Sequence, residues 1–137
     1  MILHIFVDTD VILDFLGNRK PFSKSALRLF TLAEQKKIAL YTSSNSITTA
    51  YYLLCKVTDD AHARELVSGL LDIVRVIPVS HKILSLAIKS DFKDFEDAVQ
   101  HYCALTIDEI KLIITRNIKD YAKSKIPVSG PETIFNT

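Results

Sequence analysis

The sequence has 137 residues, 48% of them hydrophobic, and contains only 3 glycines and 4 prolines. This length fits a single domain, residues 1–137, and the composition supports a buried core and excludes a long disordered segment. The 17 lysine and arginine residues nearly balance the 16 aspartate and glutamate residues, which excludes a strongly basic chain but not a local basic patch. No apolar run approaches the roughly 20 residues that span a membrane. We therefore expect a soluble, cytoplasmic protein without membrane partners.

Short apolar runs alternate with helical patterns along the chain. The runs predict strands over residues 2–7, 38–42, 73–79, 111–115 and, at an edge, 126–128. Apolar residues three and four positions apart predict helices from Thr9 or Asp10 to Gly17, then over residues 23–36, 47–54, 63–71, 82–90 and 94–105, with a short one from Pro131. Apolar strands that alternate with helices indicate a parallel sheet covered on both faces. We therefore predict an α/β fold, a three-layer α/β/α sandwich with a mainly parallel central sheet of four to five strands.

Acidic and polar side chains follow the first and fourth predicted strands. Asp8 and Asp10 come directly after the first strand, and Thr115, Asn117 and Asp120 come after the fourth. In parallel sheets, functional side chains gather at the carboxyl ends of the strands. Because the first and fourth strands are predicted neighbours, we expect these side chains to converge on one pocket.

A second group of carboxylates, which includes Asp94 and Asp97, lies at the start of the predicted helix 94–105. Clustered carboxylates repel one another, and a hard divalent cation such as Mg²⁺ or Mn²⁺ relieves that repulsion. Purely structural roles stay open at this point. Asp8 can cap the following helix, Asp94 can cap the helix that contains Asp97, and Asp14 can pair with Arg19.

Three segments resemble motifs of the PIN-domain family. Residues 5–14 resemble its opening strand and first aspartate, and residues 94–98 resemble the helix start that supplies another metal-binding aspartate. Residues 115–121, with 126–128 and 131–132 after them, resemble its closing segment. The likeness covers essentially the whole chain, in the order and spacing of the family. It implies the fold predicted above and a Mg²⁺- or Mn²⁺-dependent endoribonuclease.

The resemblance implies a role for each matching residue. Asp8 and Asp97 take the places of two metal-binding aspartates. Asn117 stands where many members carry the last acidic residue, and Asp120 follows closely enough to serve as the third metal ligand. These four residues form the implied catalytic set, and Thr115 matches a threonine or serine that supports the site.

Basic side chains close to these motifs are candidates for holding the phosphates that flank a cleaved bond, because guanidinium and ammonium groups bind phosphate oxygens. The candidates are Arg19, Arg116, Lys119 and Lys123.

The resemblance has one departure. PIN nucleases usually carry a glutamate on the helix after the second strand, and Thr49 stands at that position. A hydroxyl is a poorer metal ligand than a carboxylate, and Asp10 and Asp94 are expected to supply the missing charge. A subgroup of PIN-like proteins lacks the same glutamate, and this chain resembles that subgroup.

The main hypothesis is therefore a ribonuclease that is the toxin of a toxin–antitoxin pair, with RNA, a cognate antitoxin and a second copy of itself as partners. A first alternative is a catalytically weak or inactive PIN-like module that binds RNA or protein. A second alternative comes from Asp8-Thr9-Asp10-Val11, which fits the opening motif of haloacid-dehalogenase-like phosphatases. In that class Asp8 would be the nucleophile and Asp10 the acid/base.

Overall fold

The computed structural model describes residues 2–135, and within them five strands form one sheet. The strands are β1 (Leu3–Val7), β2 (Ile38–Ser43), β3 (Val74–Ile77), β4 (Ile110–Ile114) and β5 (Val128–Ser129). Their order is β3-β2-β1-β4-β5, and every neighbouring pair is parallel. The predicted neighbours β1 and β4 do pair, with Phe6 opposite Ile113 and Val7 opposite Ile114.

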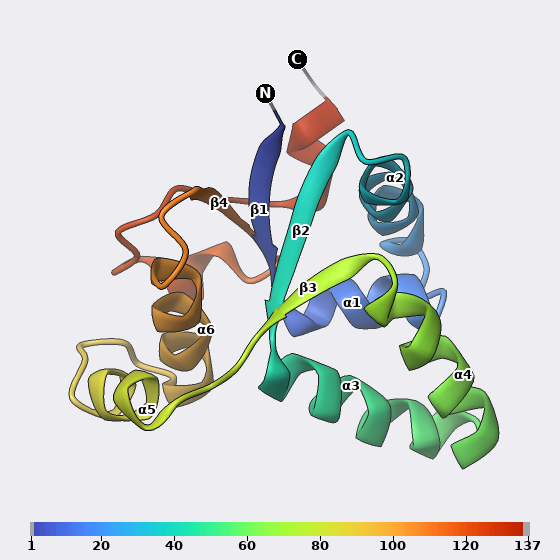
Figure 1. Ribbon diagram of the computed structural model, residues 1–137, viewed down its shortest axis with the longest axis horizontal. Coiled ribbons are helices and arrows are strands. Elements are labelled where there is room, and N and C mark those ends of the chain that lie inside the picture. Colours follow the sequence, from blue (N-terminus) through green and yellow to red (C-terminus); the bar gives the residue numbers. More distant parts are fainter. Residues whose placement is uncertain (1, 136–137) are drawn as a thin grey trace.

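Helices cover both faces of this sheet (Figure 1). On one side lie α1 (Thr9–Leu16), α2 (Ser23–Glu34), α3 (Ser44–Val57) and α4 (Asp60–Leu71), and on the other lie α5 (His81–Ile88) and α6 (Phe95–Leu105). Two 3₁₀ helices, η1 (Ile118–Tyr121) and η2 (Pro131–Phe135), lie in the last part of the chain. The predicted three-layer α/β/α sandwich is confirmed.

The central strand β1 shows why the sheet has a helical layer on each side. Ile5 and Val7 belong to the core cluster of α1 to α4, whereas Phe6 between them belongs to the cluster of α5 and α6. All three side chains are fully buried. Successive side chains of a strand point to opposite faces, and burying each apolar side chain contributes about 1.5–3 kcal/mol. A strand that is apolar at every position therefore requires cover on both sides.

Some boundaries differ from the predicted ones. β3 ends at Ile77 rather than at residue 79, because Pro78 has no N–H to donate to a ladder. The first helix starts at Thr9 and is capped by Asp8, whose side chain accepts from the Thr9 N–H, which confirms the capping role left open for Asp8. α5 covers residues 81–88 rather than 82–90, and β5 covers 128–129 rather than 126–128.

Among residues 2–135, no helix is both long and apolar enough to cross a membrane.

Candidate active site

The parallel pairing of β1 and β4 brings Asp8 and Thr115 together at the carboxyl edge of the sheet. The Asp8 N–H donates to the carbonyl of Ile114 across 2.9 Å, which continues the ladder one residue beyond β1. The Thr115 hydroxyl donates to Oδ2 of Asp8, also across 2.9 Å. Both residues are buried, with Asp8 only 7% exposed. The predicted convergence of the two strand ends is therefore present.

The carboxylate of Asp8 accepts hydrogen bonds on both oxygens. Its Oδ1 accepts from the Thr9 N–H (2.8 Å) and from Nε2 of Gln100 (3.0 Å). Its Oδ2 accepts from the hydroxyls of Thr115 (2.9 Å) and Tyr121 (2.9 Å). Donors from α1, α6, η1 and the residue after β4 thus fix the orientation of one side chain.

Gln100 connects Asp8 to helix α3 through a chain of hydroxyls. Its Nε2 also donates to the Ser46 hydroxyl (2.7 Å), and its Oε1 accepts from the Ser43 hydroxyl (2.5 Å). Ser46 in turn contacts the Thr9 hydroxyl at 2.7 Å. Gln100 is 5% exposed. Its amide therefore supplies hydrogen-bond partners to buried polar groups, whose burial without a partner would be energetically costly.

Asp97 lies in the first turn of α6, where its N–H donates to Oδ1 of the cap residue Asp94 across 3.0 Å. The cap interpretation of Asp94 is thereby confirmed. The pKa of Asp97 is raised from 3.8 to about 7, first by burial and then by the charges of Asp8, Asp94, Asp120 and Glu96. Carboxylates this close repel one another, and a bound cation reduces that repulsion.

Asp10 shows the same crowding on the α1 side. Burial and the charge of Asp8 raise its pKa to about 6, although the Arg116 N–H, which donates to its Oδ2 across 3.0 Å, acts in the opposite direction. The other oxygen, Oδ1, is buried and has no hydrogen-bond partner within the described part of the chain. A buried polar atom without a partner is unusual in a folded protein and leaves one acceptor position open.

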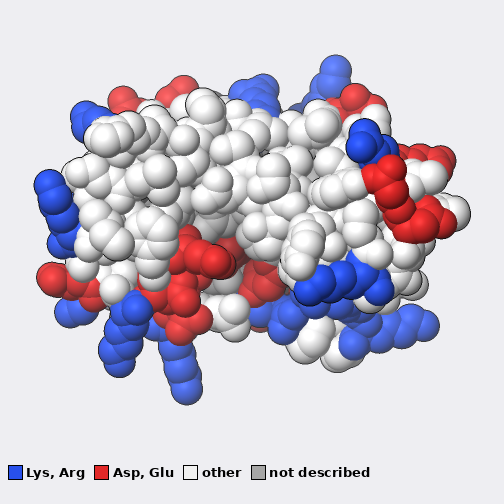
Figure 2. Space-filling view, turned by 90° about the horizontal axis from the view of Figure 1, so that it is seen from below, with Lys and Arg blue, Asp and Glu red and all other residues white. Residues whose placement is uncertain are grey.

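A cavity of about 350 Å³ lies at this edge of the sheet. It is lined by Asp8 and Asp10 from the β1–α1 turn, Ser46 and Thr49 from α3, Asp97 and Gln100 from α6, and by Arg19 and Asn117. Thr49 and Asn117 are exposed, and Asp120 on η1 is exposed as well. Seen from below, the molecule shows acidic side chains gathered around a hollow, with basic side chains on either side (Figure 2).

The donor chemistry of this cavity fits a divalent cation, because carboxylate oxygens are the ligands that Mg²⁺ and Mn²⁺ prefer. The open Oδ1 of Asp10 and the crowded carboxyl of Asp97 support the same conclusion. Within residues 2–135, however, no three His, Cys, Asp or Glu side chains are grouped closely enough to hold an ion. The charges are in place, whereas the ligand shell is not assembled.

The predicted phosphate-binding residues fall into two pairs. Arg19 and Arg116 both bind the fully buried carboxylate of Asp14: Nε of Arg19 lies 3.0 Å from Oδ1, and Nε of Arg116 lies 2.7 Å from Oδ2. The predicted Asp14–Arg19 pair is thus confirmed, and Arg116 was missed as its second partner. Lys119 and Lys123 are exposed on and just after η1.

Sequence reasoning missed Gln100 and Tyr121, although both contact Asp8 directly. A signal was present, since Gln100 lies three residues after Asp97, on the same helical face. His101, the residue after Gln100 on α6, is also buried, with Nε2 accepting from the Lys125 N–H across 3.0 Å. Burial, with a smaller contribution from the charge of Lys125, lowers its pKa to about 4.

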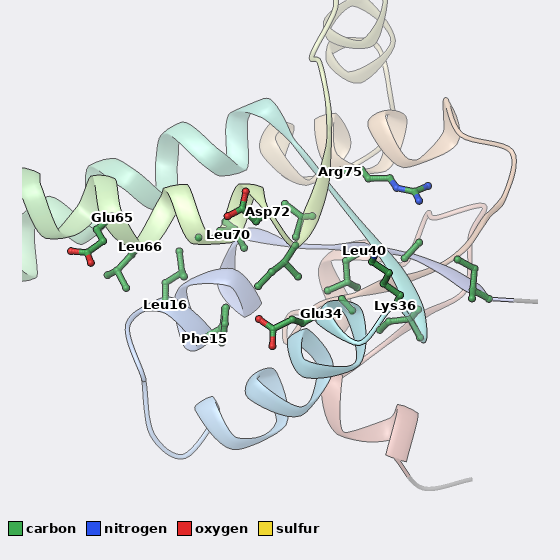
Figure 3. Close-up of a pocket in the computed structure, with 17 residues that line it drawn as sticks. Phe15, Leu16, Glu34, Lys36, Leu40, Glu65, Leu66, Leu70, Asp72 and Arg75 are labelled. Carbon is green, nitrogen blue, oxygen red and sulfur yellow. The ribbon is translucent and has the colours of Figure 1, made fainter.

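A larger cavity, about 790 Å³, lies away from the acidic site, between α1, α2 and α4 beside strands β2 and β3 (Figure 3). Apolar residues such as Phe15, Leu16, Leu66 and Leu70 line it, and polar and charged groups share its surface to a similar extent. The acidic members of that rim are Glu34, Glu65 and Asp72, and the basic ones are Lys36 and Arg75. A second cavity of about 560 Å³ shares Leu16, Glu65 and Leu66 with it. The two cavities form one groove along α4.

The family profile described as the PIN domain matches residues 4–119. This chain belongs to the PIN-domain family. Ribonuclease VapC1 of Aquifex aeolicus (strain VF5) is 31% identical to this PIN domain over 123 residues, which cover 86% of this chain and 84% of the relative. The family assignment takes the place of the haloacid-dehalogenase-like alternative.

Solved structures show the same fold as this PIN domain. A DNA-bound VapBC from Salmonella typhimurium superposes with a TM-score of 0.70 at 14% identity, covering 95% of this chain and 99% of that one. A toxin–antitoxin complex from Klebsiella pneumoniae superposes with a TM-score of 0.68 at 21% identity, covering 93% and 97%. Identities this low support the architecture alone, which agrees with the predicted PIN-like sandwich.

Proposed function

We propose that this chain, as a single PIN domain, is a divalent-metal-dependent endoribonuclease and the toxin of a toxin–antitoxin pair. The observation that carries the proposal is Asp97, whose pKa is raised to about 7 by burial and by four neighbouring carboxylates at the mouth of the cavity. Membership of the PIN family and the ribonuclease name of the Aquifex relative support it.

Asp8, Asp97 and Asp120 would hold the ion, Mg²⁺ or Mn²⁺, with Asn117 assisting at the rim of the cavity. When bound, such an ion polarises a phosphodiester and lowers the pKa of a water for attack on phosphorus. Gln100, Thr115 and Tyr121 keep the Asp8 carboxylate in one orientation through their hydrogen bonds. Asp97 gives up its proton near neutral pH, so that its carboxylate becomes available as a ligand.

The remaining residues in this proposal position the substrate or balance charge. Lys119 and Lys123 are exposed beside the acidic residues and are suited to hold flanking phosphates. Arg19 lines the cavity while bound to Asp14, so a phosphate would share its guanidinium with that carboxylate. Asp94 adds negative charge beside Asp97, and Asp10 adds it beside Asp8, in keeping with the substitution of Thr49 for a glutamate.

The groove along α4 is the surface on which we place the antitoxin. It is separate from the acidic cavity, it combines apolar with polar surface, and its rim carries both signs of charge (Figure 3). A short amphipathic segment of a partner protein fits a groove of this chemistry. A homodimer and a cytoplasmic location stay predictions.

The test of this proposal is cleavage of an end-labelled single-stranded RNA by protein purified free of any antitoxin. We expect cutting with Mg²⁺ or Mn²⁺, and none with chelator or in Asp8→Asn. Cutting that persists in chelator would contradict the metal requirement. Equal cutting by Asp8→Asn would contradict the assignment of the site.

A second candidate function is a PIN module that binds RNA without cutting it. The unassembled ligand shell among the described residues and Thr49 at the cavity favour it. This module would bind RNA in a salt-dependent way and leave it intact under every metal condition, which the same assay detects.

A further inference from the structure

An exposed aromatic ring stacks on Arg116, whose backbone N–H binds a residue that lines the acidic cavity, Asp10. Phe22 is the residue directly before α2, and it is 41% exposed. The guanidinium of Arg116 lies over this ring, with its Cζ 3.8 Å from the ring centroid. A cation at that distance is attracted by the ring face. The stack therefore joins an accessible aromatic surface to a positive charge.

The guanidinium in this stack is also hydrogen-bonded to a buried carboxylate. Nε of Arg116 donates to Oδ2 of Asp14 across 2.7 Å, and a terminal nitrogen donates to Oδ1 across 3.2 Å. Asp14 is fully buried, so the paired carboxylate is anchored in the protein. Such an arrangement is organised before a ligand arrives, which lowers the entropy cost of binding.

The stack is connected to the cavity through the segment that follows β4. The N–H of Arg116 donates to Oδ2 of Asp10 across 3.0 Å, and the next residue, Asn117, lines the cavity. Arg19 also lines the cavity and binds the same Asp14. A strand of RNA in the cavity would therefore pass next to the Phe22 ring.

We propose that Phe22, backed by Arg116, is a base-stacking subsite that takes one unpaired nucleobase of single-stranded RNA beside the cleavage site. The inference rests on the proposed RNA substrate. Proteins that bind single strands commonly stack bases on aromatic rings and support them with arginine. The subsite selects an unpaired base over a paired one, because both strands of a duplex keep their bases stacked inside. Exposed Lys20 and Lys24, on either side of Phe22 in the sequence, are suited to contact the adjoining phosphates.

The competing explanation is that Phe22 only shields the Asp14–Arg116 ion pair from water. An aliphatic side chain would provide the same shield, whereas it provides no aromatic face. Phe22→Leu therefore separates the two roles, and Phe22→Ala removes both.

The chain contains no tryptophan, so Phe22→Trp places a single fluorescent indole at the subsite. We would titrate this variant with a short oligouridylate in chelator, where no cleavage occurs. The matched control is Tyr52→Trp, because Tyr52 is 61% exposed on α3 and also carries a cation, Lys56, 4.6 Å from its ring centroid. We expect saturable quenching at position 22 only. An abasic strand of equal length and charge should quench neither variant.

Absence of quenching at position 22, or equal quenching by the abasic strand, would overturn the proposal. In cleavage assays Phe22→Ala and Phe22→Leu should both raise KM roughly tenfold with kcat unchanged, since one base stack is lost. A Phe22→Leu protein with the parent's KM would show that the ring is only a shield. Quenching by a protein that cuts no RNA would support the subsite and contradict the nuclease, so the two proposals fail separately.

Discussion

Gln100 and Asp8 are 92 residues apart in the sequence, and Nε2 of one lies 3.0 Å from Oδ1 of the other. Only one orientation of the amide satisfies these hydrogen bonds, because Oε1 accepts from the Ser43 hydroxyl while Nε2 donates to Asp8 and to Ser46. Helix α6 is thereby tied to the carboxyl ends of β1 and β2. The orientation of Asp8 thus depends on a neutral residue as well as on the acidic ones.

Replacing Gln100 with leucine removes this connection at nearly constant volume. One lone pair of Asp8 and the hydroxyls of Ser43 and Ser46 lose a buried partner, at a cost of about 1–3 kcal/mol for an unsatisfied group. Urea denaturation should show that loss in the free energy of unfolding. Gln35→Leu, at an exposed helix end, should change it by less than about 0.5 kcal/mol. Equal effects of the two variants would contradict the role of Gln100.

The raised pKa values of Asp10 and Asp97 make the stability of the metal-free protein depend on pH. Because these carboxyls bind protons more tightly in the folded than in the unfolded state, unfolding releases protons between pH 4 and pH 7. Stability should therefore fall as pH rises through about 6 and 7. Thermal unfolding in chelator measures this fall, which Asp97→Asn should reduce. His101, whose pKa is lowered from 6.5 to about 4, contributes in the opposite direction over that range. The comparison of the parent with Asp97→Asn is therefore the test, and a pH dependence of equal size in both proteins would contradict the prediction.

Divalent metal should oppose the fall in stability that the metal-free protein shows with rising pH. Ions bind the ionised carboxylates, so the rise in Tm on adding Mn²⁺ should be small at pH 5 and larger at pH 8. Asp97→Asn should lose most of the rise at pH 8. Asp91→Asn, an exposed carboxylate just before the helix, should keep it. A rise of the same size in both variants would remove Asp97 from the ligand set.

Thr49→Glu tests the departure from the usual family pattern. Thr49 is exposed and lines the cavity together with Asp8 and Asp97, so a carboxylate there adds a hard ligand without disturbing the core. Isothermal titration should show tighter binding of Mg²⁺ than in the parent. Thr49→Gln has a similar size without the charge and should show no gain. Weaker binding by the glutamate variant would mean that position 49 does not face the ion.

Gly69 offers a way to block the groove along α4. A Cβ at this position would meet no atom within 4 Å, and the residue lines the larger cavity. Gly69→Arg should fill the groove and prevent co-purification with the antitoxin, while RNA cleavage continues. Gly69→Ala is the control: it should keep the antitoxin and gain about 0.5–1 kcal/mol in the free energy of unfolding. Normal antitoxin binding by the arginine variant would place the interface elsewhere.

Much of the fold was predictable because strong local signals agree with the tertiary structure. Apolar runs such as β1 require cover on both faces, and the adjacency of β1 and β4 places Asp8 beside Thr115. The capping role of Asp94 was readable from the spacing to Asp97. These predictions rest on strand polarity and helix periodicity, which are properties of short stretches of sequence.

Other features depend on contacts between distant segments. Nothing in the local sequence shows that Arg116 turns toward Asp14, because the direction of a loop side chain is set by its neighbours in the fold. His101 on α6 is a second example. It is buried because Phe92 and Tyr102 pack around its ring and Lys125 donates to it. Gln100 and Tyr121 are neutral, so neither residue has the charge that marks a candidate metal ligand in the sequence.

The most direct test of the central claim compares RNA cleavage by the parent, Asp97→Asn and Asp91→Asn at pH 8 in Mn²⁺. The three proteins should have similar folds by circular dichroism, so that differences in rate report on the site. We predict that the parent and Asp91→Asn cut at similar rates, whereas Asp97→Asn loses about 100-fold or more, since even residues that only support metal ligands contribute about 10- to 100-fold. Cleavage by Asp97→Asn at the rate of the parent would contradict the account.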